Sequence, residues 1–209
     1  MVMAIISCIG QKGGGSKSTT ARTLVAGFTE ANWRTHLADI DEKQQTSLKW
    51  CKRREDLGLS TIDCALYRRV DTVIRMKDHY HLIVIDGRPA AETTSFDVAM
   101  ESDLIIISTG TTIDDLEPSL ELARELTKKG INKDNIVFLV SKASSESEGS
   151  KAQKTIKAWG FHVLDTVIPL KTSYGNALDE GRALYETPFK SLNLIARAMV
   201  EEVHDLINS

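Results

Sequence analysis

Six short apolar runs, separated by segments with helical patterns, constrain the fold of this chain most strongly. The runs are MAIISCI (3–9), THLADI (35–40), HLIVID (81–86), DLIIIS (103–108), NIVFLV (135–140) and HVLDTVI (162–168). Continuous runs of this length are typical of strands covered on both faces, and helices between them give right-handed parallel crossovers. The sequence therefore predicts a doubly wound α/β fold, with a mainly parallel sheet and helices on both faces.

Four segments between or after these runs have helical patterns: 18–30, 117–129, 151–159 and 191–207. Gly130 and Gly160 follow two of them, where glycine commonly ends a helix. The polar stretch KASSESEGS (142–150) is interpreted as a surface loop, and no repeat or linker divides the chain. With 209 residues, 42% of them hydrophobic, the chain is expected to form one domain over 1–209.

The charge of the chain limits its contacts with nucleic acid. A formal net charge of −3 argues against a protein whose whole surface binds DNA, so any DNA contact must be regional. Basic residues gather at 49–55 (KWCKRRE) and 67–77 (YRRVDTVIRMK), with Arg182, Lys190 and Arg197 near the last helix. Such runs are most often solvated faces, and they are the candidate positions for a regional DNA contact.

The cysteines and two apolar segments of the sequence indicate the compartment of the cell in which the protein is expected. Cys8, Cys51 and Cys64 lie far apart in the sequence without a C-x-x-C pair, which suggests neither a disulfide framework nor a zinc site. The run 3–9 is too short to span a bilayer, and 193–209 carries acidic residues and few lysines. We therefore expect a cytoplasmic protein that does not contact the membrane.

The glycine-rich segment GQKGGGSKS (10–18) directly follows the first predicted strand. Its residues 11–18 have the spacing of the pattern G-x-x-x-x-[G]-K-[ST], with Gln11 at the first glycine position and Ser16 in the bracketed place. Its backbone N–H groups could surround a phosphate at the N-terminus of the next helix. In this interpretation Lys17 contacts the β- and γ-phosphates of ATP, and Ser18 is a ligand of Mg²⁺. The candidate nucleotide-binding residues here are Gly13, Gly14, Gly15, Ser16, Lys17, Ser18 and Thr19.

A second candidate follows the third apolar run. Asp86 ends that run and Gly87 comes next, which is where a carboxylate of the Mg²⁺ shell is expected. Each signal alone has a plainer interpretation, because a glycine run can be a turn and an aspartate after a strand can cap a helix. Their order favours a nucleotide site, since ligands of open α/β sheets bind at the carboxyl ends of the strands.

With Lys12 included, KGGGSKST (12–19) has the form K-G-G-x-x-K-[ST] and resembles the deviant Walker A loop of the ParA/MinD superfamily of partition and positioning ATPases. The resemblance extends over nearly the whole chain and is closest to the small plasmid-type ParA proteins. Four further stretches resemble, in order, the family's second aspartate motif, its Walker B strand, the strand and loop after that, and the proline-containing stretch after the last strand. They are LADIDEKQQTSLKW (37–50), HLIVIDGRP (81–89), ESDLIIISTGTTIDDLEPS (101–119) and VIPLKTSYGNALDEGRALYE (167–186).

The resemblance implies an ATPase that forms a homodimer around ATP and Mg²⁺, binds DNA non-specifically in that state, and is stimulated by a ParB-like partner. It implies that Lys12 reaches across the dimer to the partner's phosphates, and that Asp41 orients the attacking water. Lys12, Lys17 and Asp41 are thus the implied catalytic residues. Asp39 would lie closer to the Mg²⁺ shell, and Pro169 against the adenine. Carboxylates after a strand also cap helices, and Pro169 also fits a plain turn proline, so both interpretations stay open.

Three positions depart from the family's pattern. Ser16 replaces the usual glycine before the lysine, where a side chain strains the backbone if the position needs a positive φ. Glu42 stands where a proline usually follows the second aspartate, and STGTT (108–112) lacks the prolines common in that loop. These departures support an alternative, in which the chain is an ATP-binding or nucleotide-free regulatory module with little or no hydrolysis because of Ser16.

Overall fold

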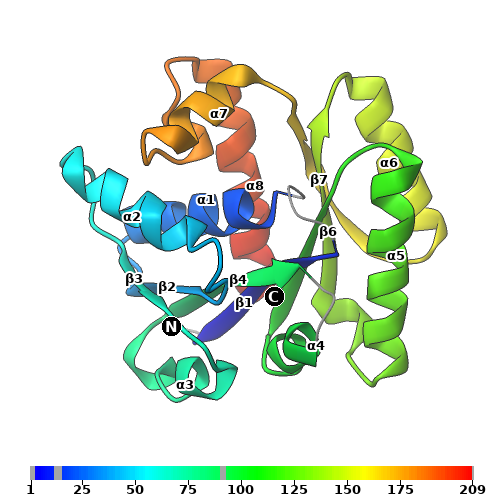
Figure 1. Cartoon of the computed structure of the whole chain (residues 1–209). Coiled ribbons are helices and arrows are strands. Elements are labelled where there is room, and N and C mark those ends of the chain that lie inside the picture. The colour runs from blue at the N-terminus through cyan, green and yellow to red at the C-terminus, as the bar shows by residue number, and fades with distance from the viewer. Residues whose placement is uncertain (1–2, 12–15, 90–92, 209) are drawn as a thin grey trace.

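A seven-stranded sheet forms the centre of the molecule (Figure 1). The computed structural model describes residues 3–11, 16–89 and 93–208. The strands are β1 (Ala4–Gly10), β2 (Thr35–Asp39), β3 (Asp63–Leu66), β4 (Leu82–Pro89), β5 (Leu104–Thr109), β6 (Ile136–Ala143) and β7 (His162–Pro169). Their order is β3-β2-β4-β1-β5-β6-β7, and each neighbouring pair is parallel. The predicted doubly wound α/β fold is confirmed.

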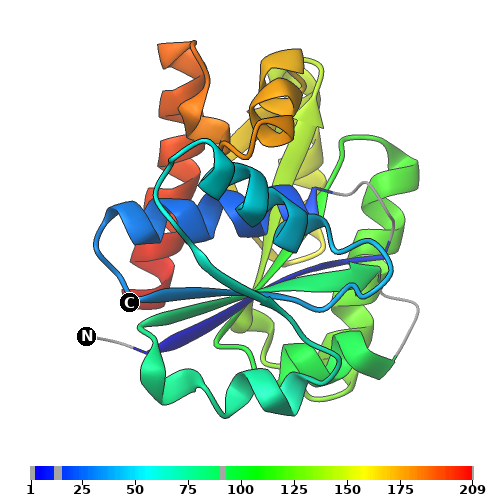
Figure 2. The same ribbon diagram turned by 60° about the vertical axis from the view of Figure 1, so that its left-hand side comes forward.

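Helices cover both faces of this sheet (Figures 1 and 2). Residues of α1, α2, α7 and α8 share one hydrophobic core with the sheet, and residues of α3, α4, α5 and α6 share the other. The helices are α1 (Lys17–Glu30), α2 (Thr46–Asp56), α3 (Val70–Ile74), α4 (Thr93–Met100), α5 (Ile113–Lys128), α6 (Glu146–Ala158), α7 (Thr172–Asp179) and α8 (Lys190–Asn208), with 3-10 turns η1 (Lys77–His79), η2 (Lys133–Asn135) and η3 (Leu184–Glu186). Within the described ranges, no helix is both long and apolar enough to cross a bilayer.

The central strand shows why the apolar runs are continuous. Ile6 and Cys8 of β1 face the core under α1 and α8, whereas Ile5 and Ile9 face the core under α4 and α5. All four side chains are buried. Because successive side chains of a strand point to opposite faces, a strand covered on both sides needs apolar residues at every position.

Two elements at one edge of the sheet escaped sequence analysis. β3 is a four-residue edge strand, DCAL, whose side chains are exposed or half-buried, so it has no apolar run. The helix before it in the chain, α2, buries only Ser47, Trp50 and Arg54 of its eleven residues. A helix that buries one large apolar side chain lacks the periodic stripe by which helices are recognised.

Two helices begin earlier than predicted. The stretch 142–150, expected to be a surface loop, instead completes β6 and starts α6 at Glu146. Ser145 caps this helix, since its Oγ accepts a bond from the backbone N–H of Glu148, and the Glu148 carboxylate accepts one from the backbone N–H of Ser144. This reciprocal arrangement is close to a capping box. The helix expected from Glu117 begins at Ile113 and contains Pro118.

The far end of α2 is fixed to the segment that follows α7. Arg54 is 2% exposed and donates to both carboxylate oxygens of Glu186, at 2.6 and 3.0 Å, and to the carbonyl of Gly181. Trp50 donates its indole N–H to the carbonyl of Arg182. Gly181 has φ +77°, and a Cβ at this residue would lie 2.4 Å from the backbone N of Arg54. The two segments therefore meet backbone to backbone.

Candidate nucleotide site

The segment leading into α1 follows the central strand, at the carboxyl edge of the sheet. Lys12, Gly13, Gly14 and Gly15, predicted to bind or act on the nucleotide, lie outside the described residues. Ser16 precedes the first helical residue and has φ 65° and ψ 7°, in the left-handed region. This conformation costs a non-glycine residue about 1 to 2 kcal/mol relative to the right-handed one. Ser16 therefore has the positive φ that, according to the sequence analysis, would strain the backbone of a residue with a side chain.

The Ser16 side chain is directed to a neighbouring strand. The Ser141 hydroxyl, at the end of β6, donates to the Ser16 hydroxyl at 3.0 Å and is also within 3.2 Å of the Thr109 carbonyl. The Ser16 carbonyl accepts bonds from the backbone N–H and the hydroxyl of Thr20, at 2.8 and 2.9 Å. These contacts hold Ser16 against both β6 and the first turn of α1.

Lys17 opens α1 and is almost fully buried, with 6% of its surface exposed. Burial lowers the pKa of its ammonium group, while the nearby carboxylates of Asp86 and Asp41 raise it. A cation is thus held at the helix N-terminus, where the backbone N–H groups of the first turn also favour an anion. This end of α1 attracts negative charge.

Asp86 lies at the centre of a cluster of hydroxyl groups. Ser18 donates to Asp86 Oδ1 at 3.0 Å, and Ser47 donates to Oδ2 at 2.6 Å. Burial raises the pKa of Asp86 to about 6; Asp39 also raises it, whereas the bonds from Ser47 and Ser18 lower it. Carboxylate and hydroxyl oxygens are the protein ligands that Mg²⁺ uses together with phosphates, and a cation would relieve the cost of burying this charge. The residues present fit a magnesium ion.

Three further side chains complete the cluster and were not predicted. The Thr46 hydroxyl lies 3.2 Å from that of Ser18, and Arg22 of α1 donates its Nε to Ser47 Oγ at 3.1 Å. Arg22 and Ser47 are both buried. Thr46 and Ser47 fall inside the stretch 37–50 that resembles a family motif. Arg22, in the middle of a predicted helix, carries no comparable signal in the sequence.

Asp39 and Asp41 both bind backbone N–H groups. Asp39 is fully buried, and its carboxylate accepts bonds from the backbone N–H groups of Asp41, Ser47 and Leu48, at 3.0, 2.9 and 3.1 Å. It therefore caps the first turn of α2, the alternative left open by the sequence, and its place near a metal stays a prediction. Asp41 Oδ1 accepts bonds from Lys43 and Gln44, both at 3.1 Å, which closes the turn after β2.

A pocket of about 710 Å³ lies beside the start of α1 and brings together three of the predicted nucleotide-binding residues, Ser16, Thr19 and Pro169. The wall opposite α1 is formed by α7, including Tyr174 and Asn176. Pockets of this size commonly hold small ligands and cofactors. Pro169 ends β7 and lines this pocket, which a turn proline elsewhere on the surface would not do.

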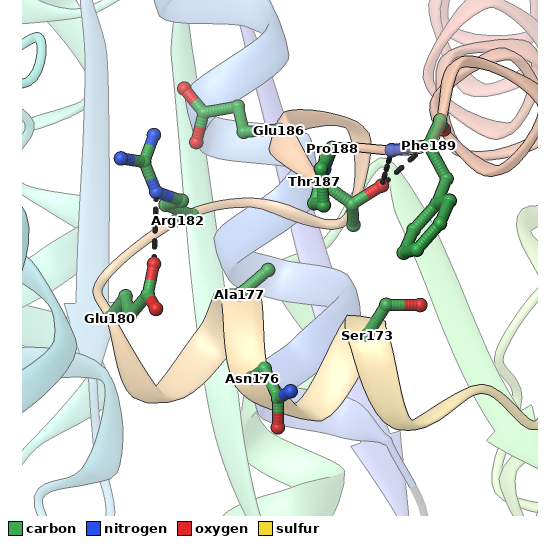
Figure 3. Close-up of a pocket in the computed structure, with 9 residues that line it drawn as sticks. All are labelled: Ser173, Asn176, Ala177, Glu180, Arg182, Glu186, Thr187, Pro188 and Phe189. Carbon is green, nitrogen blue, oxygen red and sulfur yellow. Dashed lines mark hydrogen bonds and ion pairs between the residues drawn. The ribbon is translucent and has the colours of Figure 1, made fainter.

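A second pocket, of about 520 Å³, opens next to α7 (Figure 3). All its lining residues come from α7 and the segment that follows it, up to Phe189. Its charged groups are paired: Arg182 with Glu180 at 3.2 Å, as Figure 3 shows, and Glu186 with Arg54. Asn176 lines both pockets. The strand-end residues and α1 contribute only to the larger one, which is the candidate nucleotide pocket.

The two basic stretches differ in exposure. Arg54, in the first stretch, is buried and paired with Glu186, so it is not available for a DNA contact. In the second stretch, the side chains of Arg68, Arg69 and Arg75 are 77 to 86% exposed, although each forms an ion pair with an acidic neighbour. Exposed positive charge therefore remains in both stretches, at Lys49 and Lys52 in the first and at 68–75 in the second.

Comparison with known proteins identifies the class to which this fold and site belong. The chain matches the family model of the CobQ/CobB/MinD/ParA nucleotide binding domain over residues 6–184. This chain is a member of that family, and its ParA/MinD-like character is confirmed. No curated protein sequence matches it.

Solved structures show the same fold at low sequence identity. The cell division ATPase MinD of Pyrococcus furiosus is 16% identical, with a TM-score of 0.79 over 98% of this chain and 100% of that chain. MinD of Pyrococcus horikoshii, solved with Mg-ADP, is 18% identical, with a TM-score of 0.76 over 97% of this chain and 96% of that one. A putative plasmid partition protein of Borrelia burgdorferi, bound to AMPPNP, is also 18% identical, with a TM-score of 0.74 over 97% and 98% of the two chains.

Proposed function

We propose that this protein binds ATP with Mg²⁺ at the start of α1 and hydrolyses it. The observation that carries this proposal is the cluster of the half-buried Ser18 with the buried Ser47 and Asp86, beside the 710 Å³ pocket. The pocket takes the nucleoside, and the N-terminus of α1 with Lys17 takes the phosphates. Ser18 and Asp86 hold Mg²⁺, and Asp39 supports them through its bonds to the start of α2. The solved structures bound to Mg-ADP and AMPPNP support the same choice of ligand.

In this proposal the reaction depends on positioning and on charge. Phosphoryl transfer develops charge on the oxygens of the transferred group, and bound Mg²⁺ supplies part of the compensation. Lys17, whose charge is favoured by the carboxylates of Asp86 and Asp41 against the effect of burial, supplies a second positive charge, and Lys12 of the partner subunit a third. Asp41 orients the attacking water and takes its proton as the water oxygen bonds to the γ-phosphorus, while the bond from that phosphorus to the bridging oxygen breaks and ADP leaves.

The wider role that we propose is partition or positioning of a cargo in the cytoplasm. The ATP-bound protein forms a homodimer and binds DNA without sequence preference, and a ParB-like or equivalent partner then stimulates hydrolysis and release. The exposed arginines at 68–75 offer a regional DNA contact on a chain of net charge −3. The structural similarity to a plasmid partition protein supports this role.

One observation favours a second candidate, a regulatory module that binds ATP but turns it over slowly or not at all. Ser16 adopts φ 65° with a side chain in place, and its hydroxyl is tied to Ser141. A phosphate-binding segment held in this way can bind the ground state and still misplace the reacting phosphate, because phosphoryl transfer depends strongly on alignment.

The test is ATP binding and turnover by the wild type and by Lys17→Ala. A ligand that binds only the folded state stabilises it by about 2.7 kcal/mol at a concentration of 100 Kd. We expect ATP with Mg²⁺ to raise the Tm of the wild type and of the exposed control Lys128→Ala, but not that of Lys17→Ala. Nucleotide binding is refuted if calorimetry detects no heat of binding at millimolar ATP and the Tm of the wild type does not rise. Binding without turnover, with DNA present, would favour the regulatory module.

A further inference from the structure

An ion-pair cluster at the carboxyl edge of the sheet holds the segment that carries Asp41. Glu42 accepts a bond from Arg88 Nη2 at 3.1 Å through Oε2, and its Oε1 lies 2.6 Å from Arg68 Nε. Arg68 follows β3, Glu42 follows β2 and Arg88 lies at the end of β4, and these strands are neighbours in the order β3-β2-β4. Glu42 therefore lies between two arginines supplied by the strands on either side. We call these three residues the Glu42 clasp.

Arg88 contributes more to this clasp than Arg68. Its Nε donates to the backbone carbonyl of Ile40, while its Nη2 binds Glu42, so one guanidinium contacts the residues on both sides of Asp41. The planar fork of arginine suits two such acceptors at once. The Arg88 side chain is 24% exposed and that of Arg68 is 86% exposed. Water screens the outer pair strongly and the inner pair much less.

The position of the Asp41 carboxylate depends on the backbone that this clasp holds. Both backbone N–H groups that bind the Asp41 carboxylate go to Oδ1, and in the described part of the chain no hydrogen bond to Oδ2 is seen. The turn is closed by the bond from the Gln45 N–H to the Asp41 carbonyl at 2.8 Å. Ile40, Glu42 and the turn thus set the direction in which Oδ2 points.

We propose that Arg88 is a positioning residue for ATP hydrolysis, which acts through Ile40 and Glu42 to hold Asp41 in the orientation that activates water. This inference rests on the proposed function, because it requires Asp41 to act on water. Glu42 occupies the second position of the turn, where a proline ring would fix φ near −65°. In this chain an ion pair supplies the restraint that a proline would build into the backbone.

The experiment compares Arg88→Ala and Glu42→Gln with a matched control pair, Arg124→Ala and Glu121→Gln. The control residues form an exposed ion pair on α5, with 3.1 Å between Arg124 Nη1 and Glu121 Oε1. We expect Arg88→Ala to lower kcat by about 10- to 100-fold, since small misplacements of a reacting group have effects of this size, and to change KM for ATP by less than about twofold. Glu42→Gln should act in the same direction, and the controls should match the wild type.

Two further measurements separate positioning from general loosening. Amide hydrogen exchange at 41–45, without nucleotide, should be faster in Arg88→Ala and unchanged in the controls. Adding Glu42→Pro to Arg88→Ala should restore kcat to within a few-fold of the wild type, because the ring again restrains the turn. A variant that was merely unstable would not recover in this way.

Several outcomes would overturn the inference. The clasp is an ordinary surface pair if Arg88→Ala keeps the wild-type kcat, whether or not exchange becomes faster. Arg88 acts on binding and not on the position of Asp41 if kcat/KM falls through KM alone. If the wild type itself shows no turnover with DNA present, the proposed function fails and this inference fails with it. That case is recognised first, because the wild type is measured before any variant.

Discussion

Asp86→Asn should stabilise the ligand-free protein at neutral pH while removing its response to Mg²⁺. The Asp86 carboxylate is buried, and its pKa is raised from 3.8 to about 6, chiefly by burial. Each pKa unit corresponds to about 1.4 kcal/mol, so holding this charge at pH 7.5 costs about 3 kcal/mol relative to the unfolded chain. Asparagine keeps the shape and can bond with Ser18 and Ser47 without the charge. The variant should therefore gain up to about 3 kcal/mol in the free energy of unfolding.

The pH dependence gives the same prediction a sharper form. A group whose pKa is higher in the folded state contributes stability that is present at low pH and is lost as the pH rises through the folded value. Between pH 7.5 and pH 5 the wild type should regain roughly half of this difference in the free energy of unfolding relative to Asp86→Asn. Titrating groups far from Asp86 cancel in this comparison, because both proteins carry them in the same surroundings.

Urea unfolding at pH 7.5 and pH 5 measures both quantities, and a third series with Mg²⁺ and ATP completes the test. Mg²⁺ with ATP should raise the midpoint of the wild type and leave that of Asp86→Asn unchanged. A variant that is less stable than the wild type at pH 7.5, with the same difference at pH 5, would refute the argument. It would show that the hydroxyl groups and the nearby cations compensate the Asp86 charge fully in the folded protein.

The remaining predictions concern three other positions. Ser16→Gly should raise kcat several-fold with little change in KM. It should change the free energy of unfolding by less than about 1 kcal/mol, because relief of the left-handed conformation offsets loss of the hydrogen bond to Ser141. Equal turnover in the two proteins would make Ser16 a neutral replacement. Burial lowers the pKa of His36 from 6.5, against the opposing effect of Asp63, so the free energy of unfolding of the wild type should fall as the pH drops below about 6.5. In urea titrations the free energy of unfolding of His36→Gln should fall less steeply with pH. An identical pH dependence in the two proteins would count against a buried neutral imidazole. Lys12→Ala should fold and bind ATP but stay monomeric in light scattering, and an ATP-dependent dimer of normal mass would contradict the proposed role of this lysine.

The sequence located most of the sheet because strands covered on both faces carry their own signal. The six predicted strands lie within a few residues of β1, β2, β4, β5, β6 and β7. β3 was missed because an edge strand with a half-exposed face needs no apolar run. The start of α6 was missed although Ser145 and Glu148 have the spacing of a capping box, a local signal that the polar composition of 142–150 concealed.

The site was predictable to the extent that it lies at the ends of strands. Order along the chain and strand topology were enough to expect Ser18 and Asp86 near one another, and the structure brings them into contact. Arg22 was not predictable, because its role depends on the side of α1 that faces α2, and α2 itself lacks an apolar stripe. The roles of Lys12, Lys17 and Asp41 in catalysis remain predictions.

Because α2 is attached at both ends, it connects the candidate metal site around Asp86 with the pocket proposed for the nucleotide base. The first turn of α2 supplies Thr46 and Ser47 to the cluster around Asp86, and its other end is fixed through Arg54 to the segment behind α7, which lines the nucleotide pocket. A helix held at both ends moves as a rigid body, so a displacement of its first turn also displaces its last turn. If ATP binds as proposed, a shift of α2 at the phosphates would also move Arg54 and the segment that it holds, and so would reach the pocket proposed for the base.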